Sequence, residues 1–157
     1  MHKIEIIHAG WLRNSKPLRS FLIEHELQIE FHQLGSYDKS FYKDIVIDHG
    51  SVKQEKVEDT LKSYTYGFID YSNDILNERL CAPVKIFEYI RMGIIPVTIT
   101  NKHIKKYWFK ILRNGISMFD LLTDGGRVPN IDNQYSKNII NAIDKNNNNL
   151  LREIWEE

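Results

Sequence analysis

The densest chemical signal in the chain lies between Ala82 and Val97. Pro83 suits the first position of a helix, because its ring presets the backbone angle. Gly93 suits the residue that ends the helix in a left-handed conformation. Ala82 has no side-chain oxygen to cap the free N–H groups of the first turn, and a helix start carries about half a positive charge. The pattern therefore predicts an anion site, with a water-capped helix end as the alternative.

Two charged side chains follow on one line of this helix. Lys85 lies in the first turn, where a cation suits the helix dipole poorly unless an anion is bound. Glu88 lies one turn later, and its two carboxylate oxygens match the adjacent hydroxyls of a ribose. The alternative is an ordinary surface ion pair between Lys85 and Glu88.

A glycine loop follows the apolar run Ile4–Ala9. Gly10 permits a tight turn, and the loop continues to Arg13 and Lys16. Two cations at this point could neutralise the charge that grows on a diphosphate leaving group, which would give them a catalytic role. Ordinary solvated loop charge is the alternative.

A second glycine loop, Gly50-Ser51-Val52, could meet a ligand from the other side. Glycine lets the backbone approach a ligand closely, and Val52 could then face a base. Further polar side chains that could bind sugar hydroxyls are Tyr71, Ser72 and Asn77, for which a plain surface loop is the alternative.

Short apolar runs alternate with amphipathic stretches, and these are the elements that must position the loops. The runs predict strands at Ile4–Ala9, Ile29–Leu34, Ile45–His49, Gly67–Tyr71, Ile94–Ile99 and Ile116–Leu121. The stretches predict helices at Pro17–Glu26, Gln54–Tyr64, Pro83–Met92 and His103–Leu112, with one or two more in Gln134–Trp155. This alternation is typical of an α/β fold, a Rossmann-like three-layer α/β/α sandwich with a mostly parallel six-stranded sheet. Ligands of such sheets bind beyond the carboxyl ends of the strands.

Length and composition narrow the class further. The 157 residues suit a single domain, 1–157, and 21 basic residues balance 21 acidic ones, so no overall field favours nucleic acid. No apolar run reaches the roughly 20 residues that span a bilayer. The single cysteine, Cys81, fits a buried position in a reducing compartment. We expect a cytoplasmic protein with no membrane span and no nucleic-acid partner.

The motifs together resemble the C-terminal domain of GT-B glycosyltransferases, in the retaining group typical of capsule and lipopolysaccharide synthesis. The family shows Asn, then Pro-x-Lys-x-x-Glu-Tyr, then Gly-x-x-Pro-Val; the matching residues are Asn77, Pro83, Lys85, Glu88, Tyr89, Gly93, Pro96 and Val97. Gly10, Leu12 and Lys16 are similar to the family's Gly-x-Leu-x-x-x-Lys loop. The stretch from Gly50 to Val52 is similar to its Gly-x-Val turn.

The resemblance implies a role for each matched group. Glu88 would bind the ribose, Lys16 with a nearby arginine would bind the diphosphate, and the turn at Val52 would meet the base. The sequence departs from the family at Trp11 and Pro17, where many members have arginine and glycine, so Arg13 is assigned the missing cation.

The implied activity is transfer of a sugar from a nucleoside diphosphate sugar to a glycan or lipid-linked acceptor, in the hexosyltransferase class. The acceptor-binding N-terminal domain would lie outside these residues, which implies a half enzyme that is inactive alone and that could reach the inner membrane surface through its partner. No cofactor is expected besides the donor substrate, and no metal, because the histidines are scattered without ligand spacing.

Other functions share this α/β pattern. A sugar-nucleotide epimerase-like domain and a non-catalytic interaction or regulatory domain stay open as alternatives. A dinucleotide-dependent oxidoreductase would need Gly-x-Gly-x-x-Gly after the first strand, where only Gly10 is present. A phospho-receiver domain would need acidic residues where His8 and Ala9 stand.

Overall fold

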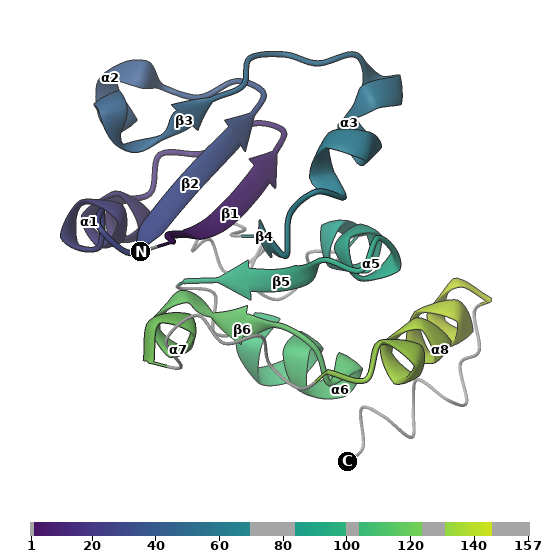
Figure 1. The fold of residues 1–157 in the computed structure, drawn as a ribbon. Helices are drawn as coiled ribbons and strands as arrows, with labels where there is room; N and C mark the ends of the chain where they lie inside the picture. The colour runs from purple at the N-terminus through teal and green to yellow at the C-terminus, as the bar shows by residue number, and fades with distance from the viewer. Residues whose placement is uncertain (1, 70–83, 100–103, 124–130, 146–157) are drawn as a thin grey trace.

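Six parallel strands form one sheet in the order β3-β2-β1-β4-β5-β6 in the computed structural model of the chain (Figure 1). The structure describes residues 2–69, 84–99, 104–123 and 131–145. The strands are β1 (Ile4–Ala9), β2 (Ile29–Leu34), β3 (Ile47–Asp48), β4 (Tyr66–Phe68), β5 (Ile95–Thr98) and β6 (Ile116–Ser117). The predicted α/β fold is confirmed. Its strand order reverses between β1 and β4, which is where sheets of this kind bind ligands.

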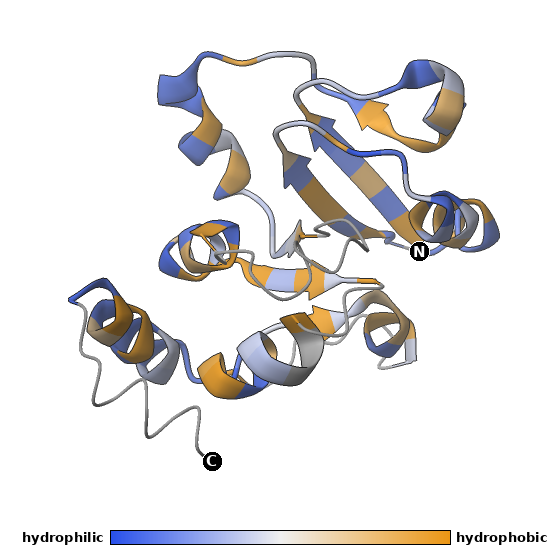
Figure 2. Cartoon of the chain, turned by 180° about the vertical axis from the view of Figure 1, so that it is seen from behind, coloured by the Kyte–Doolittle hydropathy of each residue, from blue (hydrophilic) through white to orange (hydrophobic). Residues whose placement is uncertain are grey.

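The longest pairing joins β1 to β2, from Ile4 opposite Ile29 to Ala9 opposite Leu34. Successive side chains of a strand point to opposite faces, so each of these strands serves two helical layers. Ile6 and Phe31 pack on one face, whereas Ile7 and Leu34 pack on the other. Figure 2 shows the resulting bands of hydropathy along β1 and β2.

Helices cover both faces of the sheet (Figure 1). One layer holds α1 (Lys16–Glu24) and α7 (Met118–Thr123). The other holds α3 (Gln54–Leu61), α5 (Val84–Arg91), α6 (Lys110–Leu112) and α8 (Asn133–Asp144). Among the described residues, no helix is both long enough and apolar enough to cross a bilayer.

Two predicted strands are much longer than the strands that the structure describes there. The strand predicted at Ile45–His49 is reduced to β3, because Lys43–Ile45 forms the 3-10 helix η1. The strand predicted at Ile116–Leu121 is wrong beyond Ser117, whose hydroxyl accepts a hydrogen bond from the Asp120 N–H at 3.1 Å and so caps the start of α7.

The helices also differ from the prediction in places. The short helix α2 (Lys39–Tyr42) was not predicted, although Asp38 caps it by accepting from the Phe41 N–H at 3.1 Å. The stretch predicted as one helix at His103–Leu112 begins with the π-helical segment η2 (Ile104–Phe109), continues as α6, and is followed by Arg113 in a left-handed conformation. The part of Gln134–Trp155 that follows residue 145 lies outside the described residues.

Candidate functional site

A cleft of about 320 Å³ opens beyond the carboxyl ends of β1 and β2, beside α3 and α5. Its lining consists of Ala9, Gly10, Leu34, Gly35, Ser51, Val52, Gln54, Val57, Leu61, Lys85, Glu88 and Tyr89. A second hollow of about 310 Å³ shares Gln54, Val57, Leu61 and Glu88 with it and continues between α3 and α5. Ligand pockets usually measure about 300–1,000 Å³, so each hollow is large enough for part of a nucleotide.

Two glycines form bare backbone at the floor of the cleft. Gly10 has a φ of 101° and Gly35 a φ of 119°, a region that side chains other than glycine rarely adopt. A Cβ atom on Gly35 would also lie 2.8 Å from the Gly10 carbonyl oxygen. The Gly10 N–H donates to the Leu34 oxygen at 2.9 Å, which ties the two loops together.

Gln33, which the sequence analysis missed, holds this floor from below. Its side chain is fully buried, and its Nε2 donates to the carbonyls of Gly10 at 2.6 Å and Ser36 at 3.2 Å. Its Oε1 lies 2.8 Å from His8 Nδ1. Because the amide nitrogen serves two carbonyls, the amide oxygen must accept, and His8 Nδ1 must carry the proton. The one signal in the sequence was a glutamine next to the carboxyl end of a predicted strand.

His8 is buried beneath the same loop. Burial lowers the pKa of His8 to about 3, helped by the Lys85 charge and opposed by the hydrogen bond to Gln33. His8 is therefore neutral near pH 7, and it supports the site without supplying a charge.

Lys85 reaches across to the end of β1. Its Nζ donates to the Ala9 carbonyl and lies 3.3 Å from where a Cβ atom on Gly10 would be. Burial lowers the pKa of Lys85, and the Glu88 charge partly opposes that shift. The surface ion pair between Lys85 and Glu88, considered from the sequence, is absent among the contacts of the described residues. The ammonium group lies instead beside the bare backbone of the cleft.

Glu88 lies exposed on the wall common to both hollows. Within the described parts of the chain, its carboxylate has no hydrogen-bond or ion-pair partner. Its neighbour Tyr89 fixes α5 against the sheet: the Tyr89 hydroxyl donates to the Phe68 carbonyl at 3.1 Å, and its ring covers Gly67, where a Cβ atom would be 2.7 Å away. This contact sets the rotation of α5 and so presents Glu88 to the cleft.

The loop after β3 supplies the opposite wall. Ser51 and Val52 line the cleft, whereas Gly50 anchors the loop, with a φ of 71°. The Gly50 carbonyl accepts from the Gly35 N–H at 3.0 Å, and the Gly50 N–H donates to Asp48 Oδ1 at 2.7 Å. The loops after β1, β2 and β3, which are far apart in sequence, are thus hydrogen bonded to one another at the edge of the cleft.

Arg13, on the loop between β1 and α1, and Lys16, the first residue of α1, are exposed, and neither lines the described cleft. Tyr42, another residue the sequence analysis missed, holds this loop. Its buried hydroxyl donates to the Arg13 carbonyl and accepts from the Ser15 N–H at 3.1 Å. Ser15 in turn caps α1 by accepting from the Leu18 N–H at 3.2 Å.

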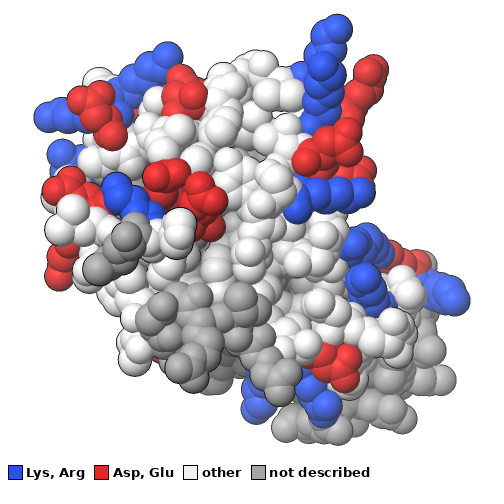
Figure 3. Space-filling model, viewed as in Figure 1, with Lys and Arg blue, Asp and Glu red and all other residues white. Residues whose placement is uncertain are grey.

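The remaining predicted ligands lie outside the described residues. These are Tyr71, Ser72, Asn77 and Pro83, together with the helix start before Val84 and the single cysteine, Cys81. Their proposed contacts stay predictions. Elsewhere on the surface, basic and acidic side chains are interspersed on the face shown in Figure 3, which agrees with the balanced composition.

Comparisons with known proteins add a likeness of fold. No protein-family model and no curated protein sequence matches the chain. Among solved structures, it is similar to the crystal structure of WaaG, a glycosyltransferase involved in lipopolysaccharide biosynthesis, with a TM-score of 0.49 and 8% sequence identity. The match covers 88% of this chain and 37% of that chain, so this chain spans well under half of that protein's length. The function must therefore be inferred from the residues of the cleft.

Proposed function

We propose that this chain is the donor-binding half of a glycosyltransferase and that the cleft holds a nucleoside diphosphate sugar. The observation that carries the proposal is the meeting of Gly10, Ser51, Val52, Lys85 and Glu88 in one cleft. These residues come from separate sequence motifs that, together, resemble the donor site of GT-B glycosyltransferases. Residues that bind the same ligand must line the same cleft, as these do.

The nucleoside would occupy the part of the cleft nearest α3 and α5. Glu88 offers an exposed carboxylate with no partner among the described residues, and two adjacent ribose hydroxyls could donate to its two oxygens. Val52 and Val57 line the same cleft and supply apolar surface, against which a base can pack. Ribose and base would thus be recognised by neighbouring groups.

The diphosphate would lie over the glycine floor. The Lys85 ammonium beside Gly10 places a cation there, and the burial that lowers its pKa would be offset by a bound anion. Arg13, on the loop that continues from Gly10, and Lys16, at the start of α1, would neutralise the charge growing on the leaving diphosphate. With these cations, the transfer would need no metal at this site.

The chain alone would bind donor without transferring its sugar. Transfer requires the anomeric carbon to be held against an acceptor oxygen, and this positioning supplies a large share of the rate. We assign that task to an acceptor-binding domain or subunit that carries a glycan or lipid-linked acceptor. This chain would itself be cytoplasmic, and it would reach the inner membrane surface through that partner.

The test is calorimetric titration of the chain with uridine, guanosine and adenosine diphosphates. Glu88→Gln removes one charged hydrogen-bond acceptor and should weaken the preferred ligand by about 1–3 kcal/mol. Glu24→Gln, an exposed change on α1 far from the cleft, serves as the matched control and should bind as wild type. Equal affinities for the two variants would reject the ribose assignment.

The cations need a separate comparison. Replacing Arg13 and Lys16 with alanine should weaken the diphosphate much more than the corresponding nucleoside. Equal losses would show that this loop has no contact with the phosphates. If no nucleotide bound at all, the non-catalytic interaction domain would be favoured. Glycosylated acceptor formed by the chain alone would contradict the half-enzyme assignment.

A further inference from the structure

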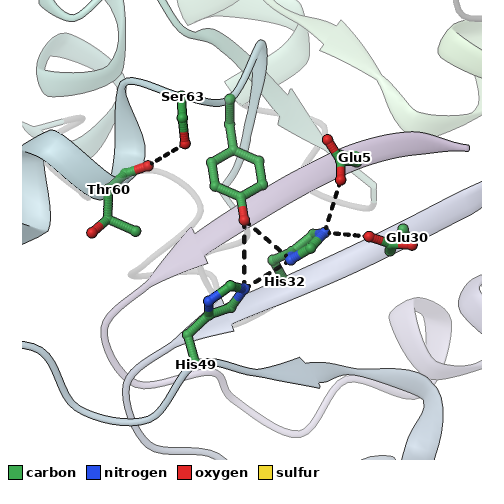
Figure 4. A network of polar contacts seen from close by, with 7 residues as sticks. Glu5, Glu30, His32, His49, Thr60 and Ser63 are labelled. Atoms are coloured by element: carbon green, nitrogen blue, oxygen red, sulfur yellow. Dashed lines mark hydrogen bonds and ion pairs between the residues drawn. The ribbon is translucent and has the colours of Figure 1, made fainter.

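A second cluster of chemically active side chains lies on β1 and β2, on the face covered by α3 (Figure 4). Glu5 stands opposite Glu30 in the parallel register, and His32 follows two residues after Glu30 on the same face. One ligand atom from each of these three residues lies within 4.8 Å of the other two. The cluster lies toward the amino end of β1, whereas the cleft opens at its carboxyl end.

The two carboxylates of this cluster lack an ordinary counter-charge. Like charges directly opposite on neighbouring strands destabilise a sheet. The Glu5 side chain is 57% exposed and that of Glu30 is 30% exposed, so solvent screens them only in part. In the described ranges, no lysine or arginine forms an ion pair with either one. Only the imidazole of His32 faces them.

His32 presents one ring nitrogen, Nε2, to these carboxylates. The residue is 7% exposed, and its Nε2 lies 2.8 Å from Glu30 Oε1 and 3.5 Å from Glu5 Oε1. Neither contact has hydrogen-bond geometry, so Nε2 is buried without a hydrogen-bond partner among the described residues. The other ring nitrogen, Nδ1, lies 2.8 Å from His49 Nε2 and 3.1 Å from the Tyr64 hydroxyl.

This geometry suits donors that share an ion. The ligand atoms of one metal ion point at the ion and not at one another. Two of them can therefore lie close together without the angle that a hydrogen bond needs. With zinc bonds of 2.0–2.1 Å and tetrahedral angles, donor atoms are about 3.3 Å apart, which falls between the two distances from His32 Nε2. A histidine ligand also usually binds a second group through its other ring nitrogen, the part that His49 and Tyr64 play for His32.

We propose that Glu5, Glu30 and His32 form a binding site for one divalent transition-metal ion, for which zinc is the best chemical fit. One imidazole and two carboxylates suit zinc, and water would complete the tetrahedron. The ion would neutralise the opposed carboxylates and link β1 to β2. Because the cluster is separate from the cleft, its role is to stabilise the strands that carry the donor site.

The test uses the full chain after treatment with a chelator. Zinc is titrated at pH 7.5 by competition with a chromophoric chelator, and thermal unfolding is followed with and without the ion. One ion should bind per chain and raise the unfolding temperature. Replacing Glu5 and Glu30 with glutamine should weaken zinc binding by about a hundredfold or more, since loss of a supporting group alone costs about 10–100-fold.

Matched variants separate this site from incidental binding. Glu24→Gln with Glu26→Gln removes the same charge elsewhere and should leave zinc affinity unchanged, as should His25→Gln. His32→Gln should abolish binding, and if that variant does not fold, the glutamine pair at Glu5 and Glu30 decides. His49→Ala, which removes a supporting contact, should lower affinity by about tenfold.

Two results would overturn the proposal. The first is no saturable zinc binding by the wild-type chain. The second is equal zinc affinity in the wild type and in the variant with Glu5 and Glu30 replaced. Either result would mean that the cluster consists only of the contacts of His32 with Glu5 and Glu30 and binds no metal ion. Neither would affect the donor cleft, because nucleotide titration measures that site separately.

Discussion

Two adjacent residues of β2, His32 and Gln33, are both buried but lie on opposite faces of the sheet and have opposite surroundings. Gln33 is fully buried, and both ends of its amide are hydrogen bonded, to two carbonyls and to His8. His32 faces two carboxylates, and its Nε2 has no hydrogen-bond partner among the described residues. Burial alone thus does not define a role. The partners show whether a polar group supports the fold or remains available to a ligand.

The same contrast extends over the two helical layers. On the side of α1, buried polar atoms hold backbone: Gln33 holds Gly10, and Tyr42 holds Arg13. On the side of α3, Glu5 and Glu30 are open to solvent and face a titratable ring. A buried polar group is costly unless it is hydrogen bonded. Substitutions on the first side should therefore destabilise the fold, whereas substitutions on the second should chiefly change ion binding.

The largest effect is expected from Gln33→Leu. The change leaves the Gly10 carbonyl, the Ser36 carbonyl and the His8 N–H without their partner, so the free energy of unfolding should fall by about 3 kcal/mol. Urea denaturation measures the loss. Glu30→Gln, three residues away on the other face, should change stability by less than about 0.5 kcal/mol in metal-free protein.

The direction of the stability change in the control, Glu30→Gln, also distinguishes the two faces. Removing one of two opposed carboxylates relieves repulsion, so Glu30→Gln should be neutral or slightly stabilising. A large loss for Glu30→Gln, with little change for Gln33→Leu, would reverse the roles assigned to the two faces.

The second largest effect is expected at acid pH, where His8 should lower the free energy of unfolding. The folded pKa of His8 is about 3, against 6.5 for the ordinary group, so between these values the unfolded chain binds a proton that the folded chain does not. Stability should therefore fall as the pH decreases through this window, by about 1.4 kcal/mol per unit for one proton. His8→Asn keeps a donor for Gln33 but does not titrate. From pH 7 to pH 4.5, wild type should lose about 2 kcal/mol more than this variant.

A control histidine isolates the effect of burial. His25 lies partly exposed at the end of α1, outside the buried floor of the cleft, and His25→Asn should follow the wild-type dependence on pH. Parallel pH curves for wild type and His8→Asn would show that His8 takes up its proton without unfolding the chain.

Local patterns in the sequence were enough to predict much of the sheet. The runs of β1 and β2 have the predicted bounds, because apolar residues recur along all six positions of each strand and leave a clear signal. The short helix α2 was missed, since its four residues have no period to read. The segment after Ser117 was assigned to a strand because a short apolar run does not distinguish a strand from a buried helix.

The residues of the candidate site also fall into two groups, those that the sequence indicates and those that it does not. Gly10, Lys85 and Glu88 could be chosen from sequence because motif order and the rule for parallel sheets place them at one edge. The roles of Gln33 and Tyr42 depend on contacts with residues 23 and 29 positions away, which local spacing does not reveal. The same reason explains why the histidines were interpreted as scattered: Glu5 joins His32 only through the register of two strands.

The smallest effect is expected at the loop that carries the proposed diphosphate ligands. Tyr42→Phe removes the hydroxyl that bonds the Arg13 carbonyl and the Ser15 N–H, and it keeps the ring in the core. The free energy of unfolding should fall by about 1 kcal/mol, the usual net value of such a bond. Tyr37→Phe is the matched control, because the Tyr37 ring packs beside Tyr42 at 6.4 Å and its hydroxyl makes no hydrogen bond with the described residues. If the loop positions Arg13 and Lys16 on a diphosphate, Tyr42→Phe should weaken nucleoside diphosphate binding a few-fold and leave nucleoside binding unchanged. Equal behaviour of the two phenylalanine variants in both measurements would show that the hydroxyl of Tyr42 does not position this loop.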